Sequence, residues 1–205
     1  MTLCPYPHQI EIGCDDWDEP WVLGRGSVKP AFSTQSENFE TAPPDELLGI
    51  DHHAVLEQTL AEFIATRGRA ETPNTASSDT DQPAPTELSL YFTSSRHIRQ
   101  INFDYRGKDK ATNVLSFESE LPAQILSELD YRPLGELVFC LEVITQEAAD
   151  QGKTLADHYT HLLVHGCLHL LGLDHETSEA DQAQMEALEI KILKRLGIAD
   201  PYAGL

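Results

Sequence analysis

The second half of the chain contains the stretch TLADHYTHLLVHGCLHLLG at residues 154–172. An apolar run of this length predicts a long helix that packs against the rest of the domain. Gly172 predicts its end, because glycine adopts the positive φ with which many helices terminate.

Shorter patterned stretches lie on both sides of this helix, and their periodicity separates strands from helices. Strands are expected at 8–12, 88–92, 113–118 and 135–142, and helices at 46–66, 94–105, 143–151 and from Ser178 onwards. Because strands and helices mix without a regular βαβ rhythm, the expected class is α+β. We predict a single domain in which a small mixed β-sheet packs against several helices.

Two of these helices have an apolar face that we expect to point inward. The inward residues predicted for the helix at 94–105 are Ile98, Ile101 and Tyr105. Those predicted for the last helix, which ends near Gly197, are Met185, Leu188, Ile192 and Leu196.

Two segments are expected to stand apart from the folded core as flexible insertions. Residues 24–45 are rich in Ser, Pro, Gly and Glu, and residues 70–87 contain no Lys, Arg, aromatic or large aliphatic side chain. Such segments bury too little apolar area to offset the entropy lost on ordering.

Composition limits the classes of partner. With 34 acidic and 14 basic residues the formal charge is −20, which argues against adhesion to DNA or to a membrane surface. No signal sequence or apolar span of about 18 residues is visible, so we expect a cytoplasmic protein. The four cysteines show no ligand spacing and are expected to be free thiols. One basic window departs from the average, and it contains Arg96, Arg99, Arg106, Lys108 and Lys110.

The segment HGCLHLLGLDH at 165–175 predicts a metal site. Two helical residues four apart lie about 40° from each other around the axis, so His165 and His169 reach one ion together. Gly172 lets the chain turn back, and His175 then supplies a third imidazole. Three histidines without a fourth protein ligand are typical of an open, catalytic zinc site with one ion per chain, although imidazoles also suit nickel or copper.

Other interpretations of these histidines remain open. A structural zinc usually has four protein ligands, and Cys167 points away from His165 and is expected in the core. The same spacing occurs in metzincin peptidases, but their general-base glutamate is replaced here by Gly166. His161 lies one turn before His165 and could either orient it or be an ordinary, partly exposed histidine.

Two separated blocks resemble the YbeY endoribonuclease family. One is HGCLHLLGLDH at 165–175, followed by EALE at 186–189 and LGIADPY at 196–202. The other is YRGKDKATNVLSF at 105–117, followed by LGELVFC at 134–140. The resemblance covers about 88–202, and more weakly 8–15 and 46–66, which would form the core of one YbeY-like metallohydrolase domain over 1–205.

The resemblance implies a zinc-dependent, single-strand-specific endoribonuclease that acts in 16S rRNA 3′-end maturation and ribosome quality control. It implies metal ligands at His165, His169 and His175, and catalytic roles for Arg106 and His165. Arg106, Lys108 and Lys110 would contact RNA. The implied partners are rRNA and the small ribosomal subunit, with a ribosomal protein or a GTPase as further candidates. Departures from the family pattern are Ala111, Glu136 and Leu173.

Two other functions compete with the nuclease. One is a ribosome-associated assembly factor whose zinc is structural, which the net charge of −20 favours slightly. The other is a zinc peptidase, which Gly166 and the basic window disfavour.

Overall fold

The computed structural model describes residues 9–14, 47, 49–67, 85–175 and 178–203. At its centre is a four-stranded mixed sheet with the order β1-β2-β4-β3. β1 (Gln9–Cys14), β2 (Thr86–Thr93) and β4 (Arg132–Cys140) run parallel, and β3 (Val114–Glu118) pairs antiparallel with β4. Six helices accompany these strands in the described ranges, so the predicted α+β class is confirmed.

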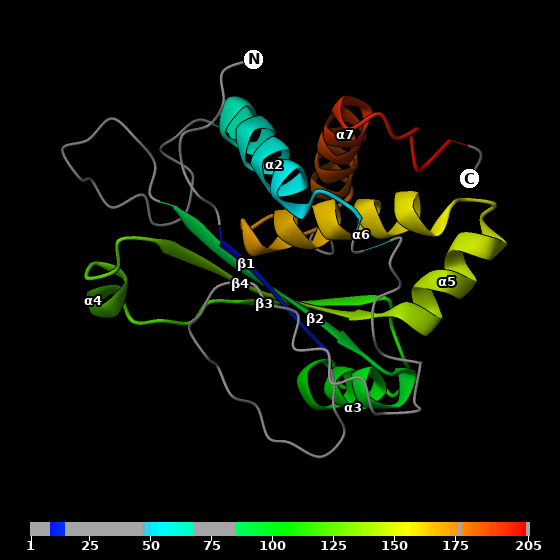
Figure 1. Cartoon of the computed structure of the whole chain (residues 1–205), viewed down its shortest axis with the longest axis horizontal. Helices are drawn as coiled ribbons and strands as arrows, with labels where there is room; N and C mark the ends of the chain where they lie inside the picture. The colour runs from blue at the N-terminus through cyan, green and yellow to red at the C-terminus, as the bar shows by residue number, and fades with distance from the viewer. Residues whose placement is uncertain (1–8, 15–46, 48, 68–84, 176–177, 204–205) are drawn as a thin grey trace.

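One face of the sheet is covered by α2 (His52–Arg67), α6 (Leu155–Leu170) and α7 (Glu179–Arg195) (Figure 1). Leu137 and Phe139 of β4 point into this layer and belong to the main core, together with Leu163 and Leu168 of α6. The helix predicted at 154–172 is α6, and Gly172 follows it with a φ of 86°. α6 therefore lies between the sheet and the outer helices.

The other face of the sheet carries α3 (Ser95–Arg106) (Figure 1). Side chains alternate along a strand, so Val138 and Cys140 point away from the main core and pack with Ile98 and Leu115 in a smaller cluster. α5 (Leu141–Asp150) connects β4 to α6, and the short α4 (Ala123–Leu126) lies between β3 and β4.

Most predicted elements are found close to their expected bounds, with two corrections. The helix expected at 46–66 begins only at His52, because the Asp51 carboxylate accepts a hydrogen bond from the Ala54 amide and caps the helix there. The prediction that Tyr105 faces inward is wrong: it is 73% exposed near the end of α3, where its ring contacts Phe117 of the edge strand β3.

The predicted stripe of the last helix is confirmed, with Met185, Leu188 and Ile192 buried and Leu196 packed against the core. The expected insertion at 24–45 and most of that at 70–87 lie outside the described residues, whereas Thr86 and Glu87 belong to β2. Among the described helices, none is long and apolar enough to span a membrane.

Candidate metal and RNA-cleavage site

α6 and the turn after it bring three histidines together. His165 and His169 lie one turn apart on α6, and the chain reverses at Gly172 so that His175 returns beside them. One ligand atom from each ring lies within 4.8 Å of the other two, and the ring centroids are 4.7–5.1 Å apart. This geometry could hold one metal ion.

The hydrogen bonds of the rings show which nitrogens face the cluster. His165 Nδ1 lies 2.7 Å from Glu189 Oε1, and because a carboxylate only accepts, the proton is on Nδ1. His165 Nε2 therefore presents a lone pair, and it lies 3.2 Å from His169 Nε2. Burial, followed by the neighbouring His165 and His175, lowers the pKa of His169 to about 4, against hydrogen bonding to the Leu173 backbone. Neutral imidazoles with converging nitrogens are the form that binds a metal.

Glu189 connects this cluster to α7. Its side chain is only 1% exposed, and it accepts hydrogen bonds from His165, from His161 Nε2 at 2.9 Å and from the Tyr202 hydroxyl. Burial alone raises the pKa of Glu189, but the bonds from His161, His165 and Tyr202 outweigh it and hold the pKa at about 2. Glu189 is therefore a buried, ionised carboxylate directly behind His165.

Sequence reasoning did not single out Glu189, although a signal was present. It lies four residues after Met185 and three before Ile192, in the middle of the apolar stripe of α7. A lone carboxylate among inward-facing residues needs a partner, since burying an unpaired charge is unfavourable. His161, whose role was left open, shares this carboxylate with His165 and does not contact His165 by any described hydrogen bond.

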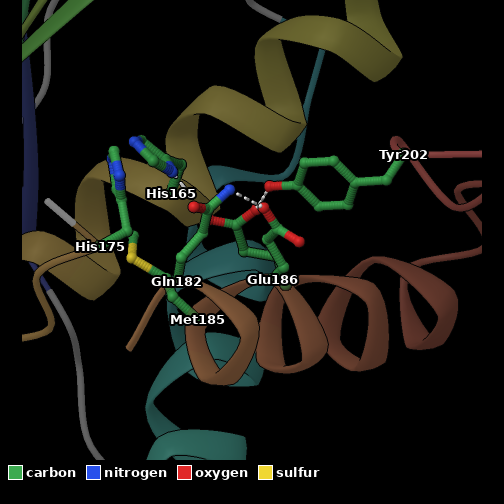
Figure 2. A pocket seen from close by; sticks show the side chains of 7 residues that line it. His165, His175, Gln182, Met185, Glu186 and Tyr202 are labelled. Carbon is green, nitrogen blue, oxygen red and sulfur yellow. Dashed lines mark hydrogen bonds and ion pairs between the residues drawn. The ribbon is translucent and has the colours of Figure 1, made fainter. Parts of the chain in front are cut away.

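A pocket of about 200 Å³ opens beside the histidines (Figure 2). It is lined by His165, His175, Gln182, Met185, Glu186, Glu189 and Tyr202. Figure 2 shows the Tyr202 hydroxyl reaching into it from the segment beyond α7, opposite the histidines. The side of the cluster that faces this pocket is therefore accessible to a small molecule or to part of a polymer.

Gly166 has a packing role that bears on the peptidase alternative. It is buried against β4, where an added Cβ would lie 2.7 Å from Leu137 Cδ2. A glutamate at this position would meet the sheet and not the pocket. A larger side chain at the position that carries the base in metzincins would therefore crowd Leu137 of β4 in this fold.

Arg106 is not brought into this pocket. It lies in the last turn of α3, on the other face of the sheet, and is exposed with Lys108 and Lys110 in the loop that follows. In the same loop, Asp109 binds Arg99 through two hydrogen bonds of 2.7 and 2.9 Å. The Asn102 amide donates to the Lys110 carbonyl at 2.8 Å and fixes the path of this loop.

Two further polar residues, His158 and Glu136, lie within the fold away from the histidine cluster. His158 is buried and bonds the Glu147 carboxylate, which also accepts from Asn113. Glu136 lies on β4, and because side chains alternate along a strand it points to the same side of the sheet as Val138, away from the main core that contains Leu137. Burial raises the pKa of the Glu136 carboxyl group.

Cys167 is fully buried, and burial raises the pKa of its thiol to about 12, so it belongs to the core as expected. Cys140 is also buried and free, and the side chains of Cys4 and Cys14 lie outside the described part of the chain.

Fold and site together define a small α+β protein with a three-histidine cluster, open on one side, that is suited to a metal ion. A sequence model described as Endoribonuclease YbeY matches residues 47–197. The chain therefore belongs to the YbeY family.

Relatives with this description include proteins from two bacterial genera. Endoribonuclease YbeY of Acinetobacter baylyi is 53% identical over 116 residues, which cover 57% of this chain and 73% of the relative. Endoribonuclease YbeY of Psychrobacter arcticus is 50% identical over 115 residues, 56% of each chain. A solution structure of a Thermotoga maritima protein aligns over 92% of both chains at 17% identity, with a TM-score of 0.43.

Proposed function

We propose that this protein is a metal-dependent endoribonuclease in rRNA processing, with one zinc ion bound by His165, His169 and His175. The observation that carries the proposal is the convergence of two Nε2 atoms at 3.2 Å, with His165 holding its proton on the opposite nitrogen. Without a metal, one Nε2 can donate to the other; when both rings carry their proton on Nδ1, the two Nε2 lone pairs are directed at a single cation. Membership of the YbeY family supplies the class of reaction.

A zinc ion held by His165, His169 and His175 would supply Lewis acidity, which would lower the pKa of water and polarise a phosphoryl oxygen. Residues of the chain would orient the metal ligands and admit the substrate. His169 stays neutral, Glu189 binds His165 Nδ1 so that the Nε2 of that ring faces the cluster, and the pocket beside His175 admits the RNA strand. We propose that the substrate is single-stranded RNA, and a pocket of about 200 Å³ supports this, because it cannot enclose a duplex.

The RNA backbone would be held by the basic window around α3. Arg96, Arg99, Phe103 and Arg106 recur at three- and four-residue steps and therefore share one helix face. The forked donors of Arg99 are already bound to Asp109, so Arg96 and Arg106 would be the arginines that bind phosphate. Phe103, which is 51% exposed, offers a ring on which a base can stack. Because α3 and α6 lie on opposite faces of the sheet, an RNA strand would have to pass around an edge of the sheet to touch both.

The proposal also covers the location of the protein, its RNA target and its partners. We place the protein in the cytoplasm, acting on 16S rRNA 3′ ends and in ribosome quality control. The charge of −20 opposes strong RNA binding by the protein alone, so a ribosomal protein or a GTPase would supply additional affinity. The chain would form one domain over 1–205.

The test is cleavage of an end-labelled single-stranded RNA by the purified, zinc-loaded chain. We expect cleavage that a chelator abolishes and that added zinc restores. His165→Ala should lose both zinc and cleavage, whereas His53→Ala, an exposed histidine of α2, should keep both. Full activity and zinc content in His165→Ala would refute the site.

Two further assays separate the competing functions. Digestion of casein instead of RNA would indicate a peptidase. Rescue of rRNA maturation in cells by the zinc-free His165→Ala variant would indicate an assembly factor and would overturn the nuclease.

A further inference from the structure

The C-terminal segment beyond α7 reaches back to the histidine cluster. Ile198 packs against the main core, and the Pro201 carbonyl accepts a hydrogen bond of 2.7 Å from Lys153 Nζ, in the loop before α6. These contacts place Tyr202 beside Glu189, to which its hydroxyl donates (Figure 2). The segment is thus attached to the loop before α6 and to α7.

The two oxygens of Glu189 have different partners. Oε1 bonds His165 Nδ1, while Oε2 accepts from both His161 and Tyr202. With Oε2 held by two donors, the carboxylate plane is fixed, and the direction of Oε1 towards His165 is fixed with it.

We infer that the C-terminal segment is part of the metal site, and that Tyr202, through Glu189, holds His165 in the tautomer and orientation that a metal requires. Both are positioning residues, since neither belongs to the three-histidine cluster itself. The inference rests on the proposed metal site. In other proteins, loss of such an outer partner weakens metal binding about 10–100-fold.

Tyr202→Phe is the first test, because it removes one hydroxyl and keeps the ring in place. We expect its dissociation constant for zinc, measured by competition with a chromophoric chelator, to rise roughly tenfold. Tyr131→Phe, a half-buried tyrosine before β4, is the matched control and should bind zinc as the unmodified chain does. Glu189→Gln should weaken zinc binding more, because the amide has one accepting oxygen for three donors.

The second readout is independent of zinc and of activity. ¹⁵N chemical shifts of the histidine rings distinguish protonation at Nδ1 from protonation at Nε2. In the metal-free chain, His165 should be Nδ1-protonated, and Glu189→Gln should shift part of the population to the other tautomer. If Glu189→Gln does not fold, Tyr202→Phe with both readouts still decides.

The outcomes separate this inference from the proposed function. Unchanged zinc affinity in Tyr202→Phe would overturn the inference while leaving the nuclease intact, and so would an unchanged tautomer population in a folded Glu189→Gln. An unmodified chain that binds no zinc would overturn the metal site and this inference with it.

Discussion

Replacing Gly166 by alanine tests the contact between α6 and the sheet. The new Cβ would lie 2.7 Å from Leu137 Cδ2 and 3.0 Å from Leu137 Cδ1, and Leu137 is fully buried and has little room to move. Overpacking of this kind destabilises by about 1–3 kcal/mol. Alanine in a helix regains about 1 kcal/mol over glycine. The free energy of unfolding should therefore fall by roughly 0–2 kcal/mol.

Repeating Gly166→Ala in the Leu137→Ala variant separates the contact with Leu137 from the effect of helix propensity. In Leu137→Ala, which by itself loses about 2–5 kcal/mol, the obstructing methyl groups are gone. Gly166→Ala should then stabilise the protein by about 1 kcal/mol, because only the helix propensity remains. The assay is urea unfolding of all four proteins in a double-mutant cycle. An equal stabilising effect of Gly166→Ala in both backgrounds would refute the contact.

Three further perturbations follow from the described contacts. Glu62 of α2 is buried and forms ion pairs with Lys191 at 2.7 Å and Arg195 at 2.5 Å, both on α7. Glu62→Gln should therefore lower the free energy of unfolding by about 1–2 kcal/mol in urea titrations. An unchanged free energy would show that the packing of α2 on α7 does not depend on these ion pairs. Burial and the neighbouring histidines lower the pKa of His169 from 6.5 to about 4, so the unfolded chain binds more protons than the folded one between these pH values. The free energy of unfolding of the metal-free protein should therefore decrease as the pH falls from 6.5 to 4. His169→Asn should make this decrease smaller, and an unchanged pH dependence would contradict the assignment. Arg106→Glu should leave zinc content unchanged and reduce RNA cleavage about tenfold or more, whereas loss of zinc would mean that Arg106 is structural.

The predicted metal ligands depend on local geometry, and local geometry is what a sequence reports well. His165 and His169 share a helix face because of the helical repeat alone. Gly172 follows the end of the helix at a φ of 86°, which glycine adopts readily because it has no Cβ atom. The caps and the apolar stripe of α7 are similarly local, which is why the predicted positions and the observed ones agree.

Other features depend on contacts between distant segments, which no local pattern reports. β1 pairs in parallel with β2 from the far side of a long intervening segment. Glu189 reaches His165 from 24 residues away, and Tyr202 reaches Glu189 from beyond the end of α7. The exposure of Tyr105 could not be predicted either, because helical spacing gives a direction but not the place where the covering sheet ends.

The sequence by itself determined the α6 helix, its paired histidines and the third histidine after the turn, since each follows from steps of a few residues. Only the tertiary structure decided that His165 is supported by a buried carboxylate, that position 166 faces the sheet, and that Arg106 lies on the opposite face. Those relations depend on how separate helices and strands pack against one another in a single dense core, which no short stretch of sequence specifies.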